Sequence, residues 1–208
     1  MPLPLKNFYM IRHGETEANA SRTMAGSIDS PLTQRGRDQA KEAGRLITAM
    51  NLIPAAIFHS SLSRARDTAL IINETLNINL HEDADLREIH AGEWEGLPYE
   101  HCEELLTTWP IIPEAEKPEE FFERVKRGKI GALNRYDDPI LIVCHGGVMR
   151  AFGALYGLNT PGNFANAHLY EFKPNPTNES FPWTVFGYSF DGEGPNVKRS
   201  ISPLYHEE

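Results

Sequence analysis

The sequence predicts an α/β fold, with three α/β/α layers in which helices cover both faces of a mostly parallel central sheet. Short apolar runs bounded by polar residues indicate strands, and capped segments with apolar residues three or four apart indicate helices between them. Strands that alternate with helices are typical of a parallel sheet covered on both faces. The chain has 208 residues, the length of one domain with a full core, so a single domain is expected over residues 1–208.

Four apolar runs are the expected strands. They are Phe8 to Ile11, Ala55 to Phe58, Ile140 to Cys144 and Leu169 to Phe172. The third is the clearest, because continuous apolar residues are typical of a strand buried on both faces. Prolines and glycines interrupt residues 174–208, where we expect one edge strand from Trp183 to Phe186 and an extended tail.

Four helices are expected from capping residues and apolar spacing. They begin after Thr33, near Ser63, at Pro118 and after the pair Gly146 and Gly147. Thr33 is a residue type that caps helix N-termini, and proline is favoured in the first turn. Gly128 and Gly131 should weaken the third helix by about 1 kcal/mol each relative to alanine.

The composition and charge argue against several classes of protein. The formal net charge of -9 would repel a nucleic-acid backbone, and the content of 40% hydrophobic and 24% charged residues is typical of globular chains. Two cysteines, Cys102 and Cys144, are too few for a disulfide framework. Neither a signal peptide nor an apolar stretch of about 18 residues is recognisable. We therefore expect a cytoplasmic protein without a membrane or nucleic-acid partner.

Three clusters of reactive side chains directly follow three of the expected strands. The clusters are Arg12 to Thr16, Ser60 to Arg64 and His145 to Gly147. Since ligands bind beyond the carboxyl ends of parallel strands, we expect the clusters to share one edge of the sheet. Two imidazoles and two guanidiniums would then meet, and guanidiniums bind phosphate oxygens in pairs. Backbone N–H groups at helix starts after Gly14 and Gly147 would add hydrogen-bond donors, so a phosphate dianion is the expected ligand.

The same clusters belong to four segments that follow one another in a fixed order. The segments are Arg12-His13-Gly14-Glu15-Thr16 with Asn19, Ser61 to Ala69, Leu86 to Ile89 with Gly92 to Gly96, and Val143 to Gly147. Together they resemble the signature of the histidine phosphatase superfamily, which has the phosphoglycerate mutase-like fold. The resemblance extends from Phe8 to about Arg150, and four ordered segments are far more specific than one Arg-His-Gly triplet.

The resemblance implies a phosphatase that forms a phosphohistidine, with His13 as the phospho-acceptor. Arg12, Arg64 and His145 would bind the phosphoryl oxygens, and Glu88 would protonate the leaving alcohol. Further candidates for substrate binding are Asn19, Gly146, Arg22 and Ser27. Whether Arg22 holds a second anionic group or only packs at a loop is left open. The expected partner is a small phosphorylated metabolite.

The two main roles require opposite protonation states. Glu88 must carry a proton near neutral pH, which burial among apolar neighbours such as Ile89 and Trp94 would favour. His13 must be unprotonated on its attacking nitrogen, and the flanking charges of Arg12 and Arg64 disfavour the imidazolium form.

Other interpretations compete with hydrolysis. His13 and His145 could bind a metal ion with Glu88 or Glu15, but no tight ligand spacing occurs, and we expect no metal or other cofactor. Six histidines lack a motif and are expected in ordinary surface or core roles: His59, His81, His90, His101, His168 and His206.

A mutase would return the phosphoryl group to another hydroxyl of the same substrate. The cofactor-dependent mutases of the family carry Thr-Gly-Trp where this chain has Ala25-Gly26-Ser27. They also have a long basic insertion where residues 98–118 are short and acidic, so hydrolysis is favoured. A binding module without turnover is the third interpretation, but it would not need an acid at Glu88. A strand near the chain end would allow pairing in a homodimer.

Overall fold

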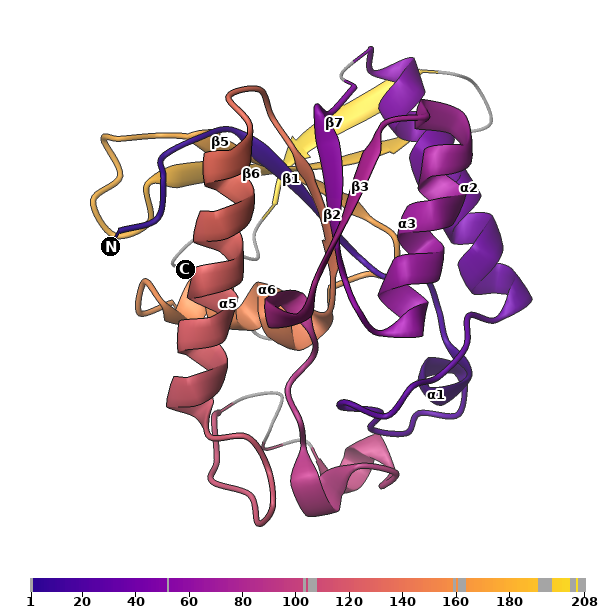
Figure 1. Cartoon of the computed structure of the whole chain (residues 1–208), viewed down its shortest axis with the longest axis vertical. Helices are drawn as coiled ribbons and strands as arrows, with labels where there is room; N and C mark the ends of the chain where they lie inside the picture. The colour runs from indigo at the N-terminus through magenta and orange to yellow at the C-terminus, as the bar shows by residue number, and fades with distance from the viewer. Residues whose placement is uncertain are drawn as a thin grey trace.

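The computed structural model describes residues 2–51, 53–102, 104, 108–158, 160, 164–190, 196–202 and 205, and its layers are those of an α/β fold. Figure 1 shows helices α2 (Gln34–Ala49) and α3 (Ser63–Leu76) on one face of the central sheet. Helices α5 (Pro118–Arg135) and α6 (Gly146–Ala154) cover the other face. The expected three-layer arrangement is therefore confirmed.

The seven-stranded sheet has the order β3-β2-β4-β1-β5-β6-β7. Its strands are β1 (Phe8–Arg12), β2 (Ala56–Ser60), β3 (Asn79–Asp83), β4 (Leu141–Cys144), β5 (Leu169–Pro174), β6 (Trp183–Phe190) and β7 (Val197–Ile201). The first four strands in this order pair in parallel, whereas β5, β6 and β7 extend the sheet by antiparallel pairing. The sheet thus has the parallel core that was expected, together with an antiparallel extension.

The helices begin where local sequence signals place them. Thr33 caps α2 by accepting a hydrogen bond from the backbone N–H of Gly36, and Pro118 occupies the first turn of α5. Helix α5 continues through Gly128 without interruption. The glycine lies where the helix passes Asp85, and a Cβ at this position would come within 2.9 Å of the Asp85 Cβ. The described residues also form the short helices α1 (Glu17–Ala20), η1 (Ala84–Leu86), η2 (Gly92–Trp94) and η3 (Tyr99–His101).

Strand β1 contributes side chains to two hydrophobic cores. Phe8 and Met10 pack on the face covered by α5 and α6, whereas Tyr9 and Ile11 pack on the face covered by α2 and α3. The alternation follows from the two-residue period of a strand. Because β1 also pairs with β4 on one side and β5 on the other, its carboxyl end lies in the interior of the sheet.

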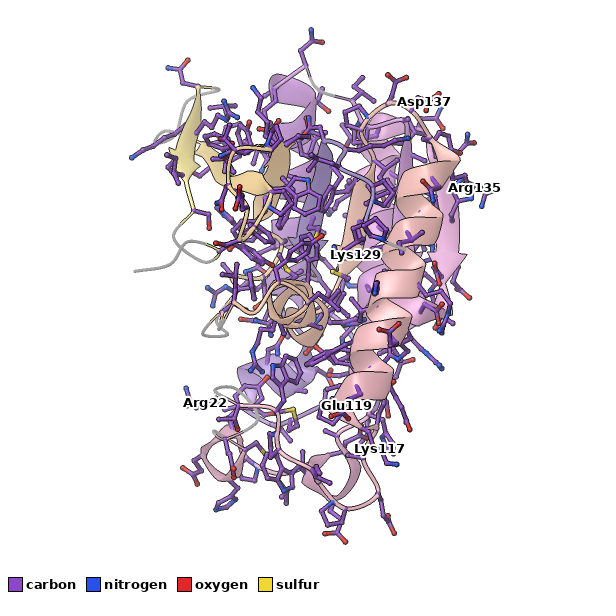
Figure 2. All side chains as sticks on the ribbon, turned by 90° about the vertical axis from the view of Figure 1, so that its left-hand side faces the viewer. Arg22, Lys117, Glu119, Lys129, Arg135 and Asp137 are labelled. Carbon is purple, nitrogen blue, oxygen red and sulfur yellow. The ribbon has the colours of Figure 1, made fainter. Side chains whose placement is uncertain are left out.

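A lysine is enclosed in the first of these cores. Lys129 has no exposed surface, and its Nζ lies 4.0 Å from the ring centre of Phe152 and 4.9 Å from that of Phe8. Figure 2 shows the residue on α5, and Nζ also contacts the Met10 sulfur at 2.9 Å. Burial lowers the pKa of Lys129 to about 7, and the nearby Cys144 thiol only partly offsets this shift.

The last described residue also packs into this core. Tyr205 is buried, and its ring is stacked against Phe181 with the centroids 5.3 Å apart. Its hydroxyl donates a hydrogen bond to the Met149 carbonyl in α6. Tyr205 is thereby tied to the helix that follows strand β4.

The structure corrects the expectation for the C-terminal region. The strand expected from Trp183 to Phe186 is longer, and it is not at the edge of the sheet, because β7 pairs with its outer side. Within the described residues, the edge strands are therefore β3 and β7, neither of which was expected. Residues 191–195, 203–204 and 206–208 of the expected tail, with His206, lie outside the described residues.

In the part of the chain that the structure describes, none of the helices combines the length and the apolar character needed to span a bilayer. The cytoplasmic location stays a prediction.

Candidate active site

Two histidines meet at the carboxyl ends of neighbouring parallel strands. Arg12 and Cys144 are paired in the register of β1 and β4, and the His13 N–H donates to the Cys144 carbonyl at 2.9 Å. The chain therefore leaves both strands side by side. The imidazole rings of His13 and His145 have centroids 5.2 Å apart and planes tilted by 58°, and both rings are buried.

The His13 ring has a defined tautomer. Its Nδ1 lies 2.8 Å from the Gly14 carbonyl oxygen, which can only accept a hydrogen bond, so Nδ1 carries the proton. Nε2 is then left with its lone pair in the neutral ring. Burial, followed by the charges of Arg64 and Arg12, lowers the pKa of His13 well below 6.5. The ring is thus held neutral.

His145 lies in a similar electrostatic environment. Its Nε2 is 2.8 Å from the hydroxyl oxygen of Ser60, a residue at the end of β2. Burial, followed by the charges of Arg64, His13 and Arg12, lowers its pKa well below 6.5. Ser60 was part of a predicted cluster, but its contact with this ring could not be recognised from the sequence.

The two expected guanidiniums lie beside these rings and are partly engaged by backbone carbonyls. Arg12 donates to the Phe164 carbonyl at 2.8 Å. Arg64, which is almost fully buried, donates to the Ile28 carbonyl at 2.9 Å and to the Gly26 carbonyl at 2.6 Å. These bonds fix both side chains and leave further N–H groups on each, because a guanidinium carries five.

Two buried nitrogens of this cluster have no hydrogen-bonding partner among the described residues. They are Nε of Arg12 and Nδ1 of His145. Buried polar atoms are nearly always paired, so unpaired ones in a basic cluster are typical of a site that a ligand completes. An oxyanion would supply acceptors for both.

Glu88 reaches the same site from the segment between η1 and η2. Its Oε2 accepts a hydrogen bond from the Gly147 backbone N–H at 3.0 Å, and its Oε1 accepts one from the Ile89 N–H at 2.9 Å. Glu88 is half-buried, and Trp94 packs in a separate small apolar cluster. The structure therefore differs from the expected apolar enclosure, because Ile89 contacts the carboxylate through its backbone.

The backbone donors after Gly14 are not available to an anion. The Gly14 N–H donates to the Thr68 hydroxyl at 3.0 Å, and the Glu15 N–H donates to the Gln39 side chain at 2.9 Å. The helix that follows, α1, has only four residues. The prediction of an anion-binding helix start after Gly14 is thus wrong, because these N–H groups already donate to the side chains of Thr68 and Gln39.

Asn19 supports the loop that carries the histidine. Its Nδ2 donates to the Tyr99 hydroxyl at 3.0 Å, and its Oδ1 accepts from Nδ2 of Asn166 at 3.2 Å. Asn166 also donates to the His13 carbonyl at 2.9 Å, a contact that no sequence motif indicated. Gly146, another candidate, begins α6 beside Arg12.

The polar atoms of Ser27 are used within the protein. Its N–H and hydroxyl both donate to Oε1 of Glu95, at 2.6 and 2.9 Å. Partial burial opposes the shift, but hydrogen bonds from Ser27, His90 and Ala91 lower the pKa of Glu95. Arg22 is exposed at the surface (Figure 2), with a left-handed backbone at φ 57°, so the question of its role stays open.

Metal coordination was a competing interpretation of the paired histidines. In the ranges that the structure describes, His, Cys, Asp and Glu side chains form no group of three or more arranged to hold a metal ion.

The fold and this edge define an α/β protein with paired histidines at the end of a parallel sheet core. The chain belongs to the histidine phosphatase superfamily, branch 1, whose family model matches residues 8–178. The sequence resemblance and the expected fold are thereby confirmed.

Similar proteins include phosphatases and a mutase. The chain is 35% identical over 145 residues to "Uncharacterized phosphatase PhoE" of Bacillus subtilis, covering 68% of this chain and 72% of that protein. It is 32% identical over 149 residues to "Probable phosphoglycerate mutase GpmB" of Citrobacter koseri, covering 66% and 68%. The structure of mycobacterial glucosyl-3-phosphoglycerate phosphatase in complex with VO3 superimposes with a TM-score of 0.71 at 25% identity, covering 86% and 97%.

Proposed function

We propose that the chain is a metal-independent phosphatase that hydrolyses a small phosphate monoester through a phosphohistidine at His13. The observation that carries this proposal is the state of the His13 ring. Its Nδ1 is committed to the Gly14 carbonyl, so the lone pair is on Nε2, and the buried cationic surroundings keep the ring neutral. A neutral imidazole beside two guanidiniums is the arrangement that attack on a phosphate dianion requires.

The first half of the reaction forms the phosphoenzyme. Nε2 of His13 attacks phosphorus while the bond from phosphorus to the ester oxygen breaks, and Glu88 gives its proton to the departing alcohol. Arg12, Arg64 and His145 hold the phosphoryl oxygens, whose negative charge the two guanidiniums balance.

The second half releases phosphate. A water molecule attacks the phosphorus of the phosphohistidine, the bond from phosphorus to Nε2 breaks, and Glu88 accepts the proton of the water. The ring returns to its neutral state. Asn19 supports the loop of His13, Gly146 lies beside Arg12, and Ser27, whose polar atoms bind Glu95, stays a candidate for substrate binding.

Hydrolysis of para-nitrophenyl phosphate, with and without a chelator, tests the activity. We expect release of phosphate that the chelator does not reduce. No turnover at any accessible pH would favour a phosphate-binding module instead, and loss of turnover with chelator would contradict a metal-independent site.

A comparison of two esters tests the role of Glu88. An alkyl ester such as glycerol phosphate needs a proton on its leaving oxygen, whereas para-nitrophenolate leaves without one. We expect Glu88→Gln to lower kcat/KM, which covers the steps up to formation of the phosphoenzyme, by about 100-fold or more for the alkyl ester and much less for the aryl ester. An equal loss on both esters would remove Glu88 from the role of proton donor.

Phosphoryl transfer between hydroxyls of one substrate is the second candidate, and the similarity to GpmB favours it. The acidic character of residues 98–118 argues against it. Phosphorus NMR of a reaction with a phosphorylated hydroxy acid distinguishes the two, because hydrolysis produces inorganic phosphate and a mutase produces a positional isomer.

A further inference from the structure

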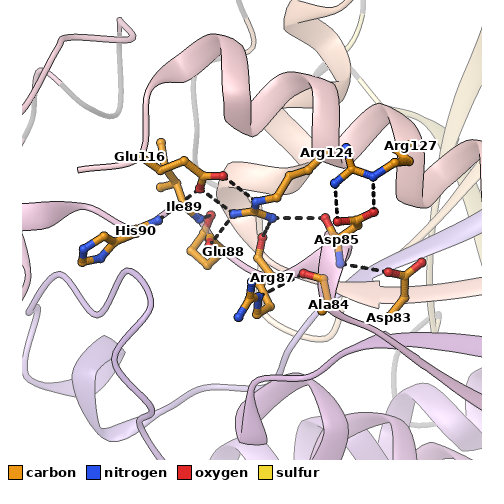
Figure 3. Close-up of polar contacts among 10 residues, drawn as sticks. All are labelled: Asp83, Ala84, Asp85, Arg87, Glu88, Ile89, His90, Glu116, Arg124 and Arg127. Atoms are coloured by element: carbon orange, nitrogen blue, oxygen red, sulfur yellow. Dashed lines mark hydrogen bonds and ion pairs between the residues drawn. The ribbon is translucent and has the colours of Figure 1, made fainter. Parts of the chain in front are cut away.

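Arg124, on helix α5, holds the backbone of the segment that carries Glu88 (Figure 3). Its Nη1 donates to the carbonyls of Asp85 and Arg87 at 3.1 and 2.6 Å. Its Nη2 donates to the Glu88 carbonyl at 2.9 Å. Three carbonyls of one short segment thus converge on one guanidinium.

Glu116 completes the set of partners. Its two carboxylate oxygens accept from Nε and Nη2 of Arg124 at 2.6 and 2.7 Å. With the three carbonyl contacts, these bonds engage all five N–H groups of the guanidinium. Glu116 also joins the segment itself, because its backbone N–H donates to the His90 carbonyl at 2.9 Å.

The surroundings of the pair strengthen these bonds. The side chains of Arg124 and Glu116 are only 12% and 17% exposed, so water competes little for them. The guanidinium carbon of Arg124 lies 4.7 Å from the ring centre of Phe121, which is buried one turn earlier on α5. A planar group with every donor engaged and one face against a ring has a single orientation.

The same segment is fixed on its other side by the active site. Oε2 of Glu88 accepts from the Gly147 N–H, and the carbonyl of the same residue accepts from Arg124. Glu88 is therefore held at both its backbone and its carboxylate.

We propose that Arg124, together with Glu116, is a positioning residue for the reaction, which keeps the Glu88 carboxyl where the leaving oxygen departs. This inference rests on the proposed role of Glu88. It assigns no contact with substrate to Arg124. Displacement of a catalytic group by about 1 Å can cost about 100-fold in rate, so loss of these bonds would be visible in the step that needs the proton.

Arg127 provides a matched control on the same helix. It forms a forked pair with the Asp85 carboxylate, with both contacts at 2.7 Å, and its side chain is 65% exposed. Arg127→Gln thus removes an arginine contact to the same segment without touching the backbone of Glu88.

The experiment measures kcat/KM, which excludes the hydrolysis of the phosphoenzyme that both esters share, for para-nitrophenyl phosphate and for an alkyl phosphate in Arg124→Gln, Arg127→Gln and Glu88→Gln. We expect Arg124→Gln to lower kcat/KM for the alkyl ester by about 10- to 100-fold more than for the aryl ester. Arg127→Gln should change both by less than about 2-fold. A loss of packing or stability alone would reduce both esters equally, and this result would overturn the proposal.

Two further variants separate position from charge and from folding. The Arg124 charge also lowers the pKa of His145, so Arg124→Lys tests whether a positive charge suffices. A lysine has three N–H donors on a single nitrogen and cannot replace the forked guanidinium, so we expect Arg124→Lys to be as impaired on the alkyl ester as Arg124→Gln. Full recovery of activity in Arg124→Lys would contradict positioning by the guanidinium. If Arg124→Gln does not fold, Glu116→Gln is judged by the same criterion, with a smaller expected difference.

The Glu88→Gln variant distinguishes failure of this inference from failure of the proposed function. A leaving-group difference in Glu88→Gln but not in Arg124→Gln would leave Glu88 as the acid and overturn only the role of Arg124. Equal losses in Glu88→Gln would overturn both.

Discussion

Gly147 donates its backbone N–H to the Glu88 carboxylate, and its missing side chain leaves the space that this carboxylate occupies. A Cβ on Gly147 would collide with Oε1 of Glu88. The glycine is required because the Glu88 side chain comes so close, and its own backbone conformation is that of an ordinary helix. A donor and an open space at one position together fix where the carboxyl group lies.

Substitution of Gly147 should damage catalysis more than stability. In Gly147→Ala the new methyl group would displace the Glu88 side chain, and we expect kcat for an alkyl phosphate to fall by about 100-fold. The control is Gly131→Ala, because a Cβ there meets no atom within 4 Å and the residue is exposed in α5. That change should keep activity and stabilise the protein by about 1 kcal/mol. Wild-type turnover in Gly147→Ala would show that Glu88 need not lie there.

Removal of the His13 ring should prevent formation of the phosphoenzyme. We expect His13→Ala to incorporate no acid-labile phosphoryl label after rapid quenching with a 32P-labelled ester, because the variant lacks the Nε2 lone pair that the Gly14 carbonyl contact leaves free. His81→Gln is the control, since His81 lies in edge strand β3 and binds the Tyr136 hydroxyl. Label retained by His13→Ala would place the nucleophile elsewhere.

The buried histidines should make the fold less stable in mild acid. Burial, then Arg64 and Arg12, lowers the pKa of His13 in the folded state, so below pH 6.5 the unfolded chain binds a proton that the folded chain does not. Stability contributed by this group is complete above pH 6.5 and falls as pH decreases, by about 1.4 kcal/mol per pH unit. In urea unfolding, the free energy of unfolding below pH 6.5 should fall with decreasing pH less steeply in His13→Asn than in the wild type, by up to about 1.4 kcal/mol per pH unit. Parallel profiles for the two proteins would contradict the shift.

The enclosed lysine should reduce stability at neutral pH. Lys129 has a pKa near 7 in the folded state against 10.5 when exposed, a cost of about 2 to 5 kcal/mol. Lys129→Met fills a similar volume without a charge, so we expect a higher free energy of unfolding at pH 7. The advantage should shrink as pH rises from 7 to 10.5, because the wild-type lysine then loses its proton in the unfolded chain as well. Lys126→Met, with a partly exposed side chain, should show no such pH dependence.

The long helices and most strands of the sheet could be predicted because their own residues carry the signal. Strands β1, β2 and β4 contain continuous apolar runs, β5 has three apolar residues in its first four, and Thr33 and Pro118 mark helix starts. Strand β3 was missed since its sequence, Asn-Leu-His-Glu-Asp, is polar and only half-buried at an edge. The same holds for β7, whose Val-Lys-Arg-Ser-Ile lies largely exposed.

Of the active site, only the residues that directly follow parallel strands could be placed together from the sequence. The meeting of His13 with His145 follows from two parallel strands, so it could be expected before any coordinates. The contact of Arg124 with Glu88 depends instead on how α5 crosses η1, with Gly128 against Asp85. No spacing in the sequence encodes that crossing, and the surroundings of Glu88 were predicted incorrectly for the same reason.

The hydroxyl of Tyr205 donates to the Met149 carbonyl, and its ring is stacked on Phe181, so one aromatic side chain braces the helix whose first turn meets Glu88. Loss of that ring would open a hole beside α6. Damage to an aromatic residue remote from the phosphate site should therefore reach turnover as well as folding.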